Sequence, residues 1–273
     1  GDLTDFNFCV EQTKDVDYVF HLAGIKGSIE VTKAKPASFF VPLLMFNTNI
    51  LEASRRNGIK KLVYTSSIGA YPAAEIFEET MGELGDPMDM YPGWAKRMAE
   101  LQIRAYAEEF GLEWSVVRPC NVYGPGDNFD VDAGHVAAGI IHKMHTAKIN
   151  GDNIVKIWGT GKPRREFLYV DDMAAASVYL MDVEKNKFET LTSPNQNHIN
   201  IGFGEDVTIA ELASLIAQIT DFKGKIEFNP IKPDGTPRKL LDCARINSFG
   251  WQPKIDLKTG LKEAYKDFLL KIF

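Results

Sequence analysis

Ser67, Tyr91 and Lys96 are residues of the types that can together move a proton to a carbonyl oxygen. Ser67 completes the run Thr-Ser-Ser at 65–67, and Tyr91 begins the run Tyr-Pro-Gly-Trp-Ala-Lys 24 residues later. A proton relay needs the tyrosine and lysine four apart on a helix, because an i, i+4 pair shares one face. Here they are five apart. Since a helix turns about 100° per residue, Tyr91 leaves the face of Lys96 unless the backbone at Pro92 compensates.

The elements that must position these residues alternate between strand and helix patterns. Helices are predicted at about 36–57 and 94–110, and each is followed by a glycine, which tolerates the left-handed conformation at a helix end. Strands are predicted at 16–22, 61–65 and 113–118. Strands separated by helices in this order predict a parallel sheet with right-handed crossovers, with ligands at the carboxyl ends of the strands. Those ends are His21 to Gly24, Thr65 to Ser67 and Pro119 to Asn121.

The pattern changes after Asn121, where a loop-like stretch precedes a mixture of short helices and strands. Helices are predicted at 134–147, 171–181, 209–219 after Thr208, near 244 and at 257–270, and strands at 154–158, from 198 and at 225–228. We therefore predict an α/β fold with a Rossmann-like parallel sheet and a smaller α/β substrate-binding lobe. Residues 1–122 with 166–183 are assigned to the sheet domain, and 123–165 with 184–273 to the smaller lobe.

Composition narrows the function classes. The chain has 273 residues, a net charge of −6 and 45% hydrophobic residues, which is typical of a globular protein with a sizeable core. Its basic residues are dispersed, so nucleic acid is not an expected partner. Cys9, Cys120 and Cys243 lack CxxC spacing, which favours buried, reduced cysteines over a disulfide framework or a metal site. The longest apolar run, 39–46, is too short to span a membrane. We expect a cytoplasmic protein with no membrane partner.

Several ordered blocks of the sequence resemble the extended short-chain dehydrogenase/reductase family, of the NAD-dependent epimerase/dehydratase type. The resemblance covers nearly the whole chain, and its last two blocks are long and specific. The blocks are His21-Leu22-Ala23, Thr65-Ser66-Ser67 with Tyr71-Pro72, Asn121 to Pro125 with Asp127-Asn128-Phe129, His135-Val136, Trp158 to Gly161, Arg165 to Leu168 with Val170 to Ser177, and Lys232 to Asp242. The resemblance implies a nucleotide-sugar epimerase/reductase with NADP or NAD as its cofactor. The implied substrate is a 4-keto-6-deoxy sugar linked to a nucleoside diphosphate, and we expect that diphosphate to be GDP. It also implies a homodimer.

The resemblance assigns roles residue by residue. Ser67, Lys96 and His135 match the catalytic serine, the lysine beside the tyrosine and the acid/base histidine. Cofactor contacts are implied for Asp2, Leu3, Leu22, Ala23, Gly24, Thr65, Lys96, Pro119, Asn121 and Val122. Contacts with the nucleotide sugar are implied for Asn121, Lys143, Trp158, Arg165 and Arg238, since arginine suits diphosphate oxygens and an indole can stack on a base. No metal site is implied.

Two departures from the family pattern concern the chemistry itself. Pro92 stands where the family has its tyrosine, and Tyr91 is the only nearby phenol. Tyr91 either reaches the catalytic position from just outside the helix or is an ordinary half-exposed tyrosine. Gly69 stands where the family has the cysteine partner of its histidine. Inversion of a centre next to a ketone needs a proton acceptor on one face and a donor on the other, so Gly69 brings full double epimerisation into question.

A third departure concerns the cofactor. No glycine-rich turn of the kind that holds a pyrophosphate follows a first strand in this sequence. Because Asp2-Leu3 resembles the end of the family's third strand, we expect the amino-terminal strands to be missing from the sequence. The alternative to an active enzyme is therefore a truncated or non-catalytic relative that only binds a nucleotide sugar.

Overall fold

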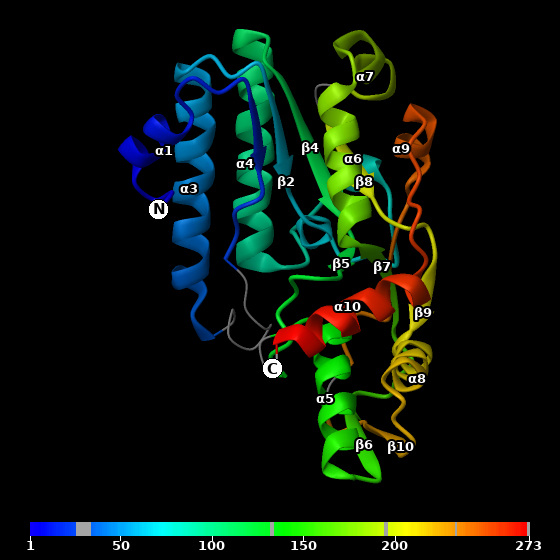
Figure 1. Cartoon of the computed structure of the whole chain (residues 1–273). Coiled ribbons are helices and arrows are strands. Elements are labelled where there is room, and N and C mark those ends of the chain that lie inside the picture. The colour runs from blue at the N-terminus through cyan, green and yellow to red at the C-terminus, as the bar shows by residue number, and fades with distance from the viewer. Residues whose placement is uncertain (26–33, 132–133, 194–195, 233, 272–273) are drawn as a thin grey trace.

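Four parallel strands form the central sheet of the computed structural model, which describes residues 1–25, 34–131, 134–193, 196–232 and 234–271. The strand order is β1-β2-β4-β8 (Figure 1). These strands are β1 (Tyr18–His21), β2 (Lys61–Thr65), β4 (Glu113–Pro119) and β8 (His198–Ile201). All three neighbouring pairs are parallel. The predicted parallel sheet is confirmed, and β8 extends it beyond the three strands predicted from the first half.

Helices cover both faces of this sheet. On one face lie α1 (Phe6–Gln12), α3 (Pro36–Arg56) and α4 (Met90–Phe110), and α6 (Val170–Asp182) lies on the other (Figure 1). The α3–α4 face buries residues such as Leu51, Ile103 and Trp114 in one apolar cluster. The helix ends predicted from glycine are confirmed, because Gly58 and Gly111 have φ of 70° and 69°, which favours a residue without Cβ.

Helix α4 begins at Met90, four residues before the start predicted from the sequence. Proline does not prevent this, because the first turn of a helix has backbone N–H groups without intrahelical acceptors, so Pro92 loses no bond there. Two backbone bonds fix the start of the helix. The Met88 N–H donates to Tyr71 O at 2.6 Å, and the Asp89 N–H donates to Gly69 O at 3.1 Å. Tyr91 is therefore helical rather than outside the helix.

The smaller lobe is built around two further sheets. One pairs β10 (Lys225–Asn229) with β6 (Ile154–Trp158), and the other has the order β3-β11-β7-β5 with β9 paired to β7. Its strands are β3 (Ile76–Phe77), β5 (Asn121–Tyr123), β7 (Arg164–Tyr169), β9 (Asp206–Thr208) and β11 (Arg238–Leu241). Helices α5 (Val136–Asn150), α8 (Ile209–Thr220) and α10 (Leu257–Lys271) share one apolar cluster with strands β5, β6, β7, β9 and β10. Figure 1 shows these three helices in the smaller lobe. The predicted cap Thr208 begins α8 in a capping box with Glu211.

Several elements were not predicted from the sequence. Residues 122 and 123 belong to the stretch predicted as a loop but form β5 with Asn121, because β7 supplies parallel partners 46 residues further along the chain. The short helix α7 (Lys185–Leu191) was not predicted either, and it packs on α9 (Ala244–Phe249), the helix predicted near residue 244, which contacts β8. Strand β8 lies within the range 184–273 predicted for the smaller lobe, yet it pairs with β4. We propose the predicted division into a sheet domain and a smaller lobe, with residues 198–201 moved from the smaller lobe to the central sheet.

Among the described residues, no helix combines the length and apolar composition that crossing a membrane requires.

Candidate functional site

Lys96 lies over the carboxyl end of β2. Its ammonium donates to the backbone oxygen of Thr65 at 2.6 Å, and it lies 5.0 Å from the centre of the Tyr64 ring. Helix α4 carries this lysine across the α3–α4 face of the sheet to the edge where ligands bind in parallel α/β folds. The structure therefore places a positive charge at the end of the strand that leads into Ser67.

Ser67 caps a short 3-10 helix, η1 (Ile68–Ala70), directly after β2. Its Oγ accepts a hydrogen bond from the Gly69 N–H at 3.1 Å. That bond orients the side chain and leaves its own O–H to donate to a ligand oxygen. Ser67 and Lys96 thus belong to one edge of the sheet, at the carboxyl end of β2.

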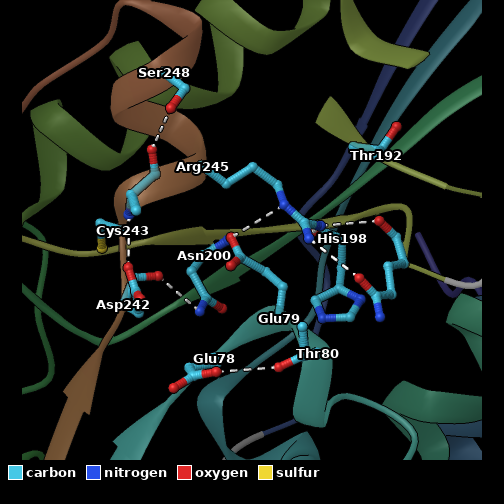
Figure 2. Close-up of polar contacts among 12 residues, drawn as sticks. Glu78, Glu79, Thr80, Thr192, His198, Asn200, Asp242, Cys243, Arg245 and Ser248 are labelled. Atoms are coloured by element: carbon cyan, nitrogen blue, oxygen red, sulfur yellow. Dashed lines mark hydrogen bonds and ion pairs between the residues drawn. The ribbon is translucent and has the colours of Figure 1, made fainter. Parts of the chain in front are cut away.

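A buried polar network anchors the turn that carries Ser67, and Figure 2 shows the part of it around Asn200, Glu79, Asp242 and Arg245. The Tyr71 hydroxyl donates to Asn200 Oδ1 at 2.7 Å, and the Asn200 amide donates to the backbone oxygen of Asp242 at 3.0 Å. The Asn200 N–H donates to the carboxylate of Glu79, which lies 4.0 Å from Arg245 Nε. Burial raises the pKa of Glu79. The turn after β2 is therefore tied to β8 and α9, elements more than 120 residues further along the chain.

An ion pair inside the protein supports the same turn. Arg118 on β4 and Glu100 on α4 form a buried, two-pronged pair, and the Ser66 hydroxyl also donates to Glu100. The Arg118 guanidinium lies 4.2 Å from the centre of the Tyr71 ring. Burial raises the pKa of Glu100, but the charge and hydrogen bonds of Arg118 outweigh it, so the pKa lies below its usual value. This pair fixes α4, β4 and the residue before Ser67 relative to one another.

Tyr91 lies at the second residue of α4 and is 42% exposed. Its ring packs on Phe40 of α3, with the ring centres 5.9 Å apart. Because α4 is a continuous helix from Met90, residues five apart on it point about 140° away from each other. No hydrogen bond joins the Tyr91 hydroxyl to any described residue. This geometry favours the ordinary half-exposed tyrosine over the catalytic role predicted for it.

We expect Tyr91→Phe to change kcat little, far less than the roughly 10²–10⁴-fold that a positioned proton donor contributes. Phenylalanine keeps the ring contact with Phe40 and removes only the hydroxyl. The measurement is steady-state turnover of the variant beside Ser67→Ala, which should lose activity. If Tyr91→Phe falls as far as Ser67→Ala, Tyr91 is the proton donor after all.

The residues predicted to contact a cofactor occupy four places, one of which is Thr65 with Lys96 at the end of β2. Leu22 and Gly24 follow β1 at the same edge as Lys96. Leu22 is 64% exposed, and among the described residues no atom beyond the chain neighbours of Gly24 lies within 4 Å of a Cβ built there. Before them, His21 is buried against Asn47 at 2.8 Å, and burial lowers its pKa to about 4, so it is neutral. Ala23 continues this segment. Pro119, Asn121 and Val122 lie at the end of β4 and in β5, and the Asn121 amide donates to Glu166 O at 2.8 Å.

The remaining predicted cofactor residues lie at the amino terminus of the chain. Asp2 caps its own turn by accepting from the Thr4 N–H at 2.9 Å. The Leu3 backbone oxygen accepts from the Asn49 amide of α3 at 3.0 Å. These bonds attach the first residues to the α3 side of the sheet.

The residues predicted to hold the nucleotide sugar do not all face an open space. Trp158 is 48% exposed, with the ammonium groups of Lys143 and Lys232 5.5 and 4.7 Å from its ring centre. Arg165 Nη1 donates to two backbone oxygens, at 2.7 and 2.6 Å, and burial lowers its pKa. Arg238 instead pairs with Asp206 at 2.5 Å, so its charge is already matched.

Lys239, which sequence reasoning missed, lies beside Arg165. The two residues are register partners in the β11–β7 pair. Burial lowers the pKa of Lys239, and among the described residues its ammonium has no hydrogen bond or ion pair. Two partly buried cations therefore lie together on this sheet, as an anionic ligand requires. The alternation of side chains along a strand explains why Lys239 shares this position and its neighbour Arg238 does not.

His135 stands at the start of α5 as its N-cap residue and is exposed. All three cysteines are buried and free, as predicted. Within the residues that the structure describes, no three His, Cys, Asp or Glu side chains come together as they would around a metal ion.

Glu166, also missed from the sequence, is fully buried between the two parts of the protein. Its carboxylate accepts from the Gly204 N–H at 2.7 Å and from the Leu241 N–H at 2.9 Å. Burial outweighs these bonds and raises the pKa of Glu166 to about 7. The group joins β7, β11 and the loop after β8, and its protonation changes close to neutral pH.

We predict a pH-dependent stability term from Glu166. The Glu166 carboxyl loses its proton near pH 4.5 in the unfolded chain but only near pH 7 in the folded protein. Its contribution to the free energy of unfolding is therefore fully present below pH 4.5 and is lost as the pH rises to 7. The free energy of unfolding of the wild type should fall by about 3 kcal/mol over that range relative to Glu166→Gln. Denaturant unfolding at several pH values measures this. The exposed neighbour Glu205→Gln is the control, and a wild-type curve parallel to Glu166→Gln would refute the assignment.

Comparison with known proteins shows the family to which the chain belongs. A family profile described as "NAD dependent epimerase/dehydratase family" matches residues 1–202. GDP-L-fucose synthase of Escherichia coli (strain K12) is 36% identical over 262 residues, covering 93% of this chain and 80% of that protein. GDP-L-fucose synthase 1 of Arabidopsis thaliana is 38% identical over 258 residues, covering 93% and 77%. The crystal structure of a GDP-L-fucose synthetase from Naegleria fowleri bound to NADP matches with a TM-score of 0.88 at 29% identity, covering 100% of this chain and 83% of that one.

Proposed function

Because this chain belongs to the NAD dependent epimerase/dehydratase family, we propose that it acts at the Ser67–Lys96 edge of the sheet on a GDP-linked 4-keto-6-deoxy sugar. It is an NAD(P)-dependent nucleotide-sugar epimerase/reductase. The observation that carries the assignment is the Lys96 ammonium, 2.6 Å from Thr65 O at the end of the strand that leads into Ser67. Relatives named as GDP-L-fucose synthases supply the substrate class.

The residues at this edge fit a dinucleotide. Leu22 offers an exposed apolar surface. Among the described residues, none but its chain neighbours lies within 4 Å of a Cβ built on Gly24, and Thr65 Oγ1 is buried without a hydrogen-bond partner. Lys96 is placed to hold a ribose hydroxyl, and Pro119, Asn121 and Val122 would border the other side. When bound, the reduced cofactor supplies a hydride. The remaining predicted contacts, Asp2, Leu3 and Ala23, stay part of this proposal.

Ser67 and Lys96 have different roles at the sugar ketone, one as a hydrogen-bond donor and the other as a positive charge. The Ser67 hydroxyl, oriented by its bond from the Gly69 N–H, donates to the ketone oxygen. As negative charge develops on that oxygen, the nearby Lys96 ammonium stabilises it. Both groups are fixed before substrate arrives, because Lys96 is held by Thr65 O and the Ser67 turn by the buried network. Such preorganised donors act where charge develops and so lower the barrier.

The nucleotide part of the substrate is bound by the smaller lobe in this proposal. Arg165 and Lys239 present two partly buried positive charges suited to a diphosphate. Trp158 and Lys143 offer a stacking surface with a cation beside it. Arg238 is also proposed to contact the phosphates, but it must first break its ion pair with Asp206. His135, at the start of α5, is proposed to move a proton at a sugar carbon.

We further propose a homodimer in the cytoplasm. Exposed apolar side chains on α3 and α4, namely Val41, Met45 and Leu101, form a surface that a second copy could cover. The two helices lie side by side, as the bond from the Gln102 amide to Thr48 Oγ1 shows. Three free cysteines suit a reducing compartment. Light scattering that gives the mass of a single chain would refute the dimer.

The assay that tests the function follows oxidation of NADPH in the presence of GDP-4-keto-6-deoxymannose. An enzyme oxidises the cofactor in proportion to the sugar reduced, and Ser67→Ala abolishes most of the rate. A protein that binds the nucleotide sugar without oxidising NADPH would be the non-catalytic alternative.

A further inference from the structure

We propose that Asp89 is the base that removes a proton from the sugar carbon next to the ketone. The inference rests on the proposed function and deepens it, because it supplies the epimerisation step that Gly69 cannot perform. Asp89 was not among the residues singled out from the sequence.

The first observation is an aspartate that does not cap its helix. Asp89 is the N-cap residue of α4, where an aspartate side chain ordinarily accepts from the N–H groups of the first turn. Here its side chain accepts none of them. A capping aspartate contributes about 1 kcal/mol of stability, and Asp89 does not make this contribution because its side chain forms no capping hydrogen bond. The carboxylate is directed elsewhere.

The second observation is where that carboxylate lies. A Cβ built on Gly69 would overlap the Asp89 carboxylate, so the side chain rests directly on the Gly69 backbone. The Gly69 N–H is the group that orients Ser67 Oγ, at 3.1 Å. The Asp89 N–H in turn donates to Gly69 O at 3.1 Å. The carboxylate is therefore fixed beside the residue that receives the ketone oxygen, in the space that any side chain at position 69 would fill.

The third observation is that Asp89 is exposed and that its charge acts on a lysine of the smaller lobe. Asp89 raises the pKa of Lys239 on β11, against the effects of burial and of Arg165. Asp89 thus lies against Gly69, next but one to Ser67, and close enough to Lys239 for its charge to act there. A sugar linked to that diphosphate, with its ketone at Ser67, passes next to Asp89. Its C–H bonds are the groups within reach of the carboxylate.

The chemistry balances without an added reactant. The Asp89 carboxylate takes the proton from the carbon next to the ketone, and the electron pair of that C–H bond moves into an enolate. Ser67 and Lys96 stabilise the enolate oxygen. A proton returned to the opposite face by His135 inverts the centre. Asp89 and His135 then exchange protons with solvent and return to their starting states, and nothing is oxidised or reduced.

Exchange of the sugar proton with D₂O tests this step apart from reduction. The wild type is incubated with GDP-4-keto-6-deoxymannose and NADP⁺ in D₂O, and NMR follows deuterium at the carbons next to the ketone against a sample without enzyme. Asp89→Asn keeps the shape of the side chain but cannot accept the proton, so we expect exchange to fall about 10²–10⁴-fold. Gly69→Ala, which displaces the carboxylate, should fall likewise. Asp86→Asn, an exposed aspartate of the same loop, should exchange like the wild type.

The separate assay of NADPH oxidation distinguishes the outcomes. Loss of exchange in Asp89→Asn with reduction largely retained supports the proposal, and the midpoint of thermal unfolding confirms that the variant is folded. Exchange in Asp89→Asn at the wild-type rate overturns it. A wild type that reduces the sugar but does not exchange also overturns it and leaves the proposed function intact. A wild type that neither reduces nor exchanges refutes both.

Discussion

Lys96→Met should lower kcat/KM for the 4-keto sugar by about 10²–10³-fold, the loss seen when one preorganised charge or donor is removed from an oxyanion site. Methionine has nearly the same length and keeps the apolar stem against Tyr64, but it removes the ammonium. The hydrogen bond to Thr65 O and the positive charge beside the ketone are lost together. Initial rates of NADPH oxidation over a range of sugar concentrations measure the effect.

Lys61 provides a matched control on the same strand. Its ammonium also donates to backbone oxygens, those of Met181 at 3.0 Å and Val183 at 2.9 Å, but at the opposite end of β2. Lys61→Met removes a comparable set of bonds away from the site and should leave kcat/KM close to the wild type. Equal losses in the two variants would show that Lys96 acts through stability alone.

Glu100→Gln should destabilise the protein by about 3–5 kcal/mol, because it leaves the Arg118 charge buried without a counter-charge. Arg118 is 1% exposed, and its Nε and Nη2 donate to the two carboxylate oxygens of Glu100. The variant also weakens the contact with Ser66, the residue before Ser67. Denaturant unfolding gives the change in the free energy of unfolding.

Glu108 on the same helix is the control for this second prediction. It lies 3.7 Å from Arg104 in an exposed i, i+4 pair, and such pairs contribute about 0.3–0.5 kcal/mol. Glu108→Gln should therefore change stability little. Replacing both members of the buried pair with apolar residues should cost less than Glu100→Gln, since no uncompensated charge remains. A loss in Glu100→Gln no larger than in Glu108→Gln would contradict this account of the pair.

The sequence predicts the parts of this protein that depend on local pattern. Alternating apolar strands and helices ended by Gly58 and Gly111 are sufficient for the parallel sheet, and the run ending at Ser67 locates one ligand-binding edge. The structure starts α4 four residues before the predicted residue 94, because the first turn of a helix tolerates Pro92. That difference bears directly on Tyr91, whose helical position separates it from the face of Lys96.

Groups brought together by long-range contacts could not be predicted in the same way. Glu100 and Arg118 look like surface residues in the sequence, and only the crossing of α4 over β4 buries them as a pair. Lys239 and Arg238 are adjacent, and only the register of β11 against β7 tells which one joins Arg165. Asp89 carries the ordinary signature of a helix cap. A helix beginning at Met90, rather than at Trp94, was the signal that could have directed attention to it.

Transfer of the hydride to the sugar is the central claim, and a labelled cofactor tests it most directly. NADPH carrying deuterium on its reactive face is mixed with GDP-4-keto-6-deoxymannose and the enzyme, and the product is examined by NMR and mass spectrometry. We predict one deuterium at C4 of the sugar for each NADPH oxidised by the wild type, and almost none with Lys96→Met over the same time. Oxidation of the cofactor without deuterium at C4, or unchanged labelling in Lys96→Met, would contradict the proposed site.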